Sequence, residues 1–253
     1  MKKIIALIIF CFSFSFIFAE KKTYSSAIDT WVEIDDNSIT FNYCDPFEND
    51  VCKTYNYTLE KKENFEWLSI NNNGTKKTFL LLKSEEFLIL YESTRKEPFF
   101  WGFYSFRKLE LLSFLKKTNV TTSSELQENK TIYSGDSLGN LNLESPWVEG
   151  SKGDGIGEYI ILNINASEVF ILSGFISYQK PYLYEQNNRP KKIKISFPES
   201  NYQDIYFDLA DTPNPQKITL KEDYNGKLKI EIIDIYKGSK YSDLCISSIP
   251  YLH

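Results

Sequence analysis

The stretch WVEGSKGDGIGEYIIL, Trp147 to Leu162, places four glycines, two glutamates and an aspartate in a short turn that leads into an apolar run. Glycine adopts backbone conformations that are closed to other residues, so this composition is typical of a bend. The tyrosine, isoleucines and leucine that follow favour a β-strand. The stretch therefore predicts a glycine turn that introduces a strand. Glu149 and Glu158 in it raise the question of a catalytic or ligand-binding site.

The second half of the chain continues this pattern of short apolar runs and polar turns. Runs of this length at near-regular spacing, with no convincing helix between them, predict an antiparallel β-sandwich rather than alternating β–α units. Turns rich in Asn, Gly, Pro and Asp separate them. The predicted strands are EYIILNI, EVFILSGFISY, KKIKISF, QDIYFDL, QKITL, KLKIEIIDIY and LCISSI.

The first half is also β-rich. From Trp31 to Ser93, apolar runs alternate with turns such as NNNGTKK, whose Asn–Gly pair is a strong hairpin signal. Aromatic residues make up 16% of the chain, which favours β structure. We expect an antiparallel meander or small barrel, followed by RKLELLSFLKK as a short helix or a last strand. The polar segment 117–131 lacks apolar periodicity and predicts a linker.

The N-terminus, MKKIIALIIFCFSFSFIFAEKK, has the pattern of a secretory signal peptide that is cleaved after Ala19. Its apolar run, Ile4 to Phe18, is shorter than the ~20 residues that a membrane-spanning helix requires. We therefore expect a secreted, periplasmic or cell-surface-associated protein with no transmembrane span. The predicted division is 1–19 signal peptide, 20–116 β-rich domain to which we assign no function, 117–131 linker and 132–253 second domain.

The chain is acidic. Removing the signal takes Lys2 and Lys3 from the 29 basic residues and leaves 34 acidic ones, so the net charge is near −7. An acidic chain without a concentrated basic stripe lacks the electrostatic footprint that duplex nucleic acid requires. We predict no nucleic-acid partner, and the sequence leaves the oligomeric state open.

Three cysteines remain after signal cleavage. Cys44 and Cys52 flank the turn-like DPFEND, so in an oxidising compartment they predict a disulfide across a hairpin. Cys245, within LCISSI, then has no partner and is expected to be a small apolar strand residue.

Few residues suit catalysis or metal binding. A nucleophile paired with histidine would have to use the terminal His253, so we expect no triad. GSKGDGIG lacks the Gly-Lys-Ser/Thr ending of a P-loop and matches no EF-hand, although a structural cation held by Asp154 and backbone carbonyls stays open. Glu149 and Glu158 would suit a two-carboxylate glycoside hydrolase if the glycine loop folds back.

The segment YQKPYLYEQNNRPKK, Tyr178 to Lys192, favours a binding surface. Sugars have apolar faces and hydroxyl edges, which aromatic rings beside amides and a guanidinium suit physically. Packing of the loop explains the same tyrosines equally well. The side chains in question are Tyr178, Tyr182, Tyr184, Asn187, Asn188 and Arg189.

Four segments, taken in order, resemble the NADase-type glycan-binding domain, a discoidin-like, galactose-binding-like jelly roll of the factor V/VIII C type. They are WVEGSKGDGIGEYIIL, GFISYQKPYLYEQNNRPKKIKISF, FDLADTPNPQKITL and IEIIDIYKGSKYSDLCISSI. The resemblance covers roughly Leu143 to Ile249. It implies a bacterial β-sandwich that recognises a glycan without reacting with it.

The resemblance also implies which residues bind. Those that fall on its motifs are Trp147 and Glu149 in WVEG, Glu158 in GIGE, Tyr184 shortly before NNR, and Asn187, Asn188 and Arg189 in NNR. Trp147 would equally serve as a core residue, and Glu149 or Glu158 would equally pair with Arg189 inside the protein. The chain departs from the family pattern in LNLESPW, upstream of the first motif, and at Ser248, where the family tends to have glutamate.

We therefore predict an all-β, non-enzymatic protein without cofactor whose second domain binds a glycan or glycoconjugate through loops at one end of the sandwich. The predicted ligand-binding residues, which we call the ligand lip, are the motif residues of the preceding paragraph together with Tyr182. The alternatives are a protein-interaction or envelope-structural module that keeps the fold without a sugar site, and a hydrolase that uses Glu149 and Glu158.

Overall fold

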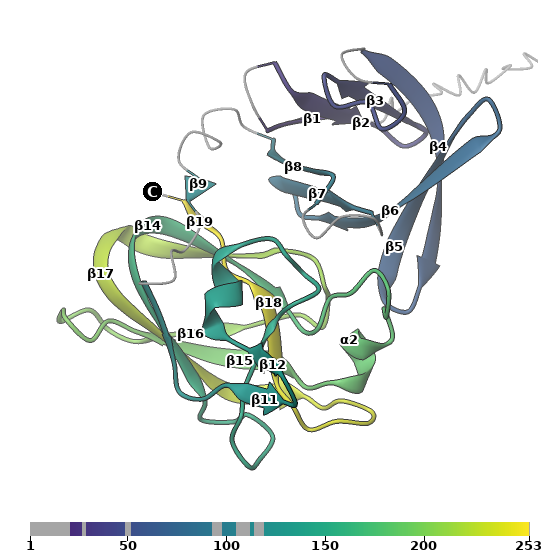
Figure 1. Ribbon diagram of the computed structural model, residues 1–253. Coiled ribbons are helices and arrows are strands. Elements are labelled where there is room, and N and C mark those ends of the chain that lie inside the picture. Colours follow the sequence, from purple (N-terminus) through teal and green to yellow (C-terminus); the bar gives the residue numbers. More distant parts are fainter. Residues whose placement is uncertain are drawn as a thin grey trace, which may run out of the picture.

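The computed structural model describes residues 21–26, 29–48, 52–92, 98–104, 112–113 and 119–252. The first half forms a closed barrel and the second half a larger β structure (Figure 1). This confirms the predicted all-β class, with a smaller β domain before the sandwich. The predicted signal peptide, its cleavage site and His253 lie outside the described residues. Within those residues, no helix has the length and apolar character that a membrane crossing requires.

Eight antiparallel strands make up the barrel, which closes where β1 pairs with β8 at Ser25 and Phe103. At this seam a Cβ on Gly102 would lie 2.9 Å from the Ser25 carbonyl, so only glycine fits. The strands are β1 (Lys22–Ser25), β2 (Trp31–Ile34), β3 (Ser38–Asn42), β4 (Lys53–Lys62), β5 (Phe65–Asn72), β6 (Thr75–Lys83), β7 (Phe87–Tyr91) and β8 (Phe100–Phe103).

Strand β7 and the second half of strand β6 are buried on both faces. Phe79 and Leu81 of β6 point into the barrel core, whereas Leu80 and Leu82 belong to a second apolar cluster outside the barrel. All five residues of β7 are buried. Successive side chains of a strand point to opposite faces, so burial of both faces produces the continuous apolar runs TFLLL and FLILY.

The second half forms a nine-stranded sheet with the order β13-β18-β14-β17-β15-β16, to which β10, β19 and β9 are added. Its framework is the long antiparallel pair β14 and β17, which runs from Tyr159–Glu231 to Ile171–Gln216 with a bulge between Ala166 and Glu168. The strands are β9 (Leu112–Ser113), β10 (Val120–Thr122), β13 (Trp147–Val148), β14 (Tyr159–Ser173), β15 (Arg189–Ser196), β16 (Ile205–Asp208), β17 (Gln216–Tyr236), β18 (Cys245–Ser248) and β19 (Tyr251–Leu252).

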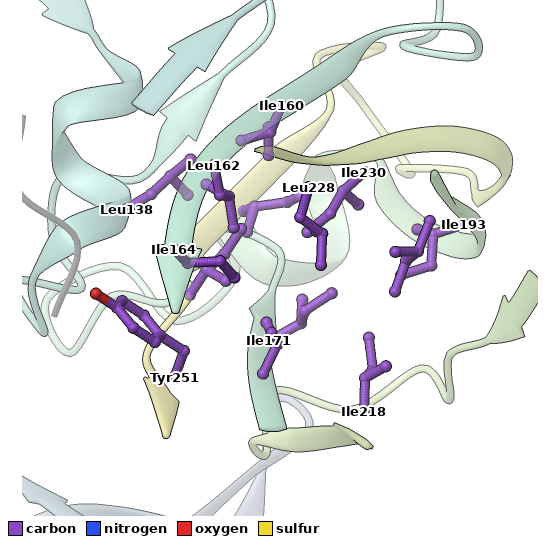
Figure 2. Packing of buried hydrophobic residues seen from close by; sticks show 14 of the residues in the cluster. Leu138, Ile160, Leu162, Ile164, Ile171, Ile193, Ile218, Leu228, Ile230 and Tyr251 are labelled. Atoms are coloured by element: carbon purple, nitrogen blue, oxygen red, sulfur yellow. The ribbon is translucent and has the colours of Figure 1, made fainter. Parts of the chain in front are cut away.

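Isoleucine and leucine dominate the sandwich core. Figure 2 shows Ile160, Leu162 and Ile164 of β14 packed toward Leu228 and Ile230 of β17. These residues alternate along their strands, as expected when one face of each strand is buried. Two short helices lie within residues 120–252, η2 (Gly135–Gly139), whose Leu138 joins this core, and α2 (Leu183–Gln186).

An apolar interface joins the barrel to the sandwich. The β14 residues Val169 and Ile171 face the sandwich core, whereas Phe170 and Leu172 face the barrel. The Phe170 ring lies 5.9 Å from that of Phe87 and 5.6 Å from that of Phe103. The two β structures therefore share one continuous cluster of buried side chains, which fixes their relative orientation.

The predicted linker 117–131 is corrected by the structure, which describes it from residue 119 onward. Val120–Thr122 is strand β10 and pairs with β14, and residues 126–133 form a hairpin of β11 (Leu126–Glu128) and β12 (Thr131–Tyr133). Between them, the Glu125 carboxylate accepts hydrogen bonds from Ser134 Oγ at 2.9 Å and Gly135 N at 2.8 Å. The segment is polar because it lies at the surface of the sandwich, not because it connects two domains.

The predicted Cys44–Cys52 disulfide is not formed in the structure, where Cys44, Cys52 and Cys245 are free thiols. The Cys44 thiol donates to the Trp31 carbonyl at 3.6 Å, and burial raises its pKa to about 12. Cys52 is exposed and directly precedes β4. Cys245 is buried in β18, as expected for a small apolar strand residue.

Candidate functional site

Trp147 is a core residue. Its side chain is completely buried, and its strand β13 pairs with β18. The indole N–H donates to the Ser124 carbonyl at 2.9 Å. A buried indole needs such an acceptor, and here the bond fastens the 123–125 loop to the sandwich. Of the two interpretations of Trp147, the structure favours the core residue over the ligand lip.

The two glutamates that frame the glycine turn also hold loops. Glu149 is buried, and its carboxylate accepts from Ser151 N at 2.7 Å and from Ser151 Oγ at 2.9 Å. Glu158 accepts hydrogen bonds from Ser123 Oγ and Ser124 Oγ. Burial alone would raise the pKa of Glu158, but the serine hydroxyls outweigh it and lower the pKa below its usual value. Glu158 is therefore stabilised in its ionised form, in which it holds the segment of Ser123 and Ser124 in place.

Arg189 pairs with Asp211, which the sequence did not single out, and not with Glu149 or Glu158. Arg189 Nε and Nη2 contact Asp211 Oδ1 and Oδ2 at 2.7 and 2.9 Å, the bidentate geometry of a strong ion pair. Its Nη1 donates to the carbonyls of Tyr184 and Asn187 at 2.9 and 2.7 Å. Only 5% of Arg189 is exposed, so its N–H groups form hydrogen bonds that stabilise the fold.

The remaining predicted residues divide between buried and exposed positions. Asn188 Nδ2 donates to the carbonyls of Asp154 and Ser242, and its Oδ1 accepts from Gly238 N, so one buried amide joins three loops. Asn187 donates to Leu183 O. The Tyr184 ring is buried in the barrel interface, 5.6 Å from Phe65. Tyr182, by contrast, is 44% exposed.

Asp154 has structural partners rather than a cluster of ligands. Its Oδ1 accepts from Ile156 N at 3.3 Å, and its carbonyl accepts from Asn188. Across the portion of the chain that the structure describes, no group of three or more His, Cys, Asp or Glu side chains is placed to hold a metal ion.

A pocket of about 460 Å³ opens beside these anchored loops. Its walls come from the β11–β12 hairpin, the loop that follows β14, and the 241–243 segment before β18. Figure 1 shows the hairpin at one end of the sandwich, with β9 and β19 at the other. Among the predicted ligand-binding residues, Asn187 lines the pocket. The other lining residues of the pocket are Leu126, Glu128, Tyr133, Glu144, Val148, Phe175, Ser177, Gln179, Lys180, Leu183, Tyr241 and Asp243. We call it the end-loop pocket.

The walls of the end-loop pocket are held in place. The Glu144 carboxylate accepts from Ser177 Oγ at 2.6 Å and from Tyr178 N at 2.7 Å, which fixes the loop after β14. The rings of Tyr133 and Phe175 meet edge to face at 6.2 Å across the pocket wall. The shape of the pocket is therefore largely formed before any ligand arrives.

The end-loop pocket is acidic. Glu128, Glu144 and Asp243 line it together with one cation, Lys180. Burial, and then the neighbouring Glu128, raise the pKa of Asp243. The pocket thus combines aromatic rings with hydrogen-bond acceptors in a negative environment.

The sequence model of a family described as NAD glycohydrolase translocation F5/8 type C domain matches residues 114–252. The chain belongs to this family. The F5/8 type C domain therefore begins before the predicted boundary at residue 132 and includes strand β10 and the β11–β12 hairpin. No curated protein sequence is significantly similar to the chain.

Solved structures similar to the chain share few identical residues with it. One is the family 32 CBM from C. perfringens NanJ in complex with galactose, with 14% identity, a TM-score of 0.39, and coverage of 56% of this chain and 100% of that chain. Another is the C-terminal domain of a chitobiase from Bacteroides fragilis, with 18% identity, a TM-score of 0.38, and coverage of 55% and 96%. A third is the arabinofuranosyltransferase AftD from Mycobacteria, with 10% identity, a TM-score of 0.40 and coverage of 56% of this chain, which spans 11% of that protein.

Sequence reasoning missed most of the end-loop pocket of the F5/8 type C domain. The predicted linker includes Glu128, and no sequence motif marks Tyr133, Tyr241 or Asp243 as pocket residues. One signal was present in ELQENKTIY, where two short runs flank an Asn–Lys turn. Asn129 at this turn has a φ of 53°, a conformation that asparagine tolerates better than most residues.

Proposed function

We propose that the protein is a non-enzymatic glycan-binding protein, and that the end-loop pocket of its F5/8 type C domain holds the sugar. The observation that carries this proposal is the pocket itself, where aromatic rings and carboxylates converge between loops fastened by Glu144, Asn188 and Arg189. Of the motif residues expected to bind the glycan, Asn187 lines the pocket, whereas the hydrogen bonds of Asn188 and Arg189 hold loops beside it.

The chemistry of the end-loop pocket suits a neutral sugar. A pyranose presents an apolar C–H face to a ring such as Tyr241, which is 38% exposed, and hydroxyl edges to acceptors such as Glu128 and Asp243. Three carboxylates beside one ammonium group oppose a ligand that carries its own carboxylate. We therefore propose that neutral and amino sugars bind in preference to sialic or uronic acids.

The placement of the two glutamates disfavours the hydrolase alternative. A glycosidase needs a carboxylic acid with a raised pKa to protonate the leaving group. The pKa of Glu158 is lowered, because hydrogen bonds from serine hydroxyls outweigh its burial. Glu149 is engaged by Ser151, and neither glutamate lines the end-loop pocket.

Replacing Tyr241 by alanine is expected to weaken glycan binding about tenfold or more, because the sugar loses an aromatic contact worth on the order of 1 kcal/mol in addition to buried area. Hits on a glycan array identify the ligand, and isothermal titration of the full chain then measures the change. Tyr206→Ala is the matched control, since Tyr206 is 59% exposed on β16 and lies outside the pocket. A blank array, or equal losses in both variants, would favour the protein-interaction alternative.

We also propose that the protein acts outside the cytoplasm after removal of residues 1–19, in keeping with its basic start, apolar run and Ala19. The exported protein is then expected to begin at Glu20. Sequencing the N-terminus of protein recovered from the culture medium or cell envelope tests this, and a chain that still begins at Met1 would contradict it.

A further inference from the structure

A second pocket lies at the opposite end of strand β15. Its volume is about 220 Å³, and it is formed by the β15–β16 loop against the middle of β17. Asn187, in the wall of the end-loop pocket, precedes β15, whereas Phe197, in the wall of this second pocket, follows it. At ~3.3 Å per residue, the eight-residue strand separates the two pockets by roughly 25 Å. A ligand in one does not touch the other.

Three aromatic rings form the wall of the second pocket. Phe197 packs edge to face on Tyr224 at 4.8 Å and on Tyr202 at 5.5 Å. Tyr224 is fixed further, because its hydroxyl donates to the Lys227 carbonyl at 2.7 Å. Tyr202 is 49% exposed and forms the outer part of the wall. The pocket therefore offers a supported aromatic surface that is open to solvent.

The described part of the second pocket's rim is polar but uncharged. It carries the exposed amides of Asn201 and Gln203, whose side chains form no hydrogen bond within the described ranges. The nearby charges of Glu199 and Lys227 neutralise each other in an ion pair of 2.8 Å. Among the lining residues whose side chains the structure describes, none is charged. A matching ligand is therefore neutral, with one apolar face and an edge that both donates and accepts hydrogen bonds.

We propose that the second pocket binds one neutral pyranose ring, stacked against Tyr202 and hydrogen-bonded by Asn201 and Gln203. The volume lies below the ~300–1,000 Å³ of pockets that enclose drug-sized ligands, which suits a single ring rather than an extended oligosaccharide. This inference stands independently of the end-loop pocket. If both pockets bind, one chain contacts two sugar groups, and its avidity for a surface dense in glycans exceeds either single affinity.

The test uses the full chain with methyl glycosides of galactose, glucose and N-acetylglucosamine, monitored by saturation-transfer NMR and by titration calorimetry. The Tyr241→Ala variant is the background, since it weakens the end-loop pocket. At least one glycoside is expected to retain binding in that background, and adding Tyr202→Ala is expected to weaken the remaining binding about tenfold. Adding Tyr206→Ala instead is expected to leave it unchanged, because that tyrosine is also exposed but lies outside both pockets.

The proposal is overturned if no glycoside shows a binding component that Tyr202→Ala reduces, or if Tyr206→Ala reduces it equally. Thermal unfolding of each variant verifies that the fold is intact, which the exposure of both rings leads us to expect. If the proposal for the end-loop pocket is wrong, the Tyr241→Ala variant will bind the glycosides as strongly as the wild type, and this outcome is distinct from the one for Tyr202.

Discussion

Replacing Phe170 by alanine is expected to lower the free energy of unfolding by about 3–5 kcal/mol, the usual cost of removing a fully buried phenylalanine ring. Phe170 is completely buried between the sandwich and the barrel, against Phe87 and Phe103. Its removal leaves a cavity in the interface itself. We expect the wild type to unfold in a single transition, because the two β structures share one cluster, and Phe170→Ala to unfold in two, one for each β structure.

Differential scanning calorimetry and urea unfolding measure both effects. Phe170→Leu, which refills most of the space, is expected to cost less than half as much. Ile132→Ala is the surface control, since Ile132 is 57% exposed on β12, and it is expected to change stability by less than about 0.5 kcal/mol. A Phe170→Ala variant that loses less than about 1 kcal/mol would show that the interface contributes little.

Replacing Arg189 by alanine is expected to cost about 3 kcal/mol of folding stability. The change removes both contacts to Asp211 and leaves the Tyr184 and Asn187 carbonyls without their buried donor. The two carbonyls lie at either end of the segment 184–187, which runs beside the end-loop pocket. We therefore expect the affinity for the glycan to fall as well, although Arg189 itself does not line the pocket.

Denaturant unfolding of Arg189→Ala and Arg189→Lys separates charge from geometry. Lysine keeps the charge but cannot reproduce the planar fork, so we expect it to restore only part of the stability. Lys192→Ala on the same strand is the matched control, because its ion pair with Asp208 is 3.7 Å long and exposed, and its loss is expected to cost less than about 1 kcal/mol. Equal losses for Arg189→Ala and Lys192→Ala would refute the structural role of Arg189.

The class and order of the two β structures could be predicted from the sequence, because strand periodicity and turn residues are local signals. The interface could not, since it depends on which face of a strand meets a distant partner. A clue was present in TFLLL and FLILY, where Leu80, Leu82 and Ile89 fill the positions that an exposed barrel face would leave polar. Such runs indicate a strand covered on both sides.

The candidate site shows a different limit. Motif residues such as Asn188 and Arg189 lie beside the end-loop pocket, but their residue types suit a ligand hydroxyl and a backbone carbonyl equally well. Their partners lie far along the chain, at Ser242 for Asn188 and at Asp211 for Arg189. Only the folded structure shows that these donors are already occupied.

The apolar interface also determines which form of the protein suits binding measurements. A sandwich separated from the barrel would present Phe170, Leu172 and Leu252 to water on one face. Contiguous apolar surface of this kind causes self-association and precipitation. The barrel therefore covers an apolar face of the F5/8 type C domain that would otherwise be exposed to water. We expect affinities measured with the sandwich alone to reflect aggregated protein rather than binding in the pocket.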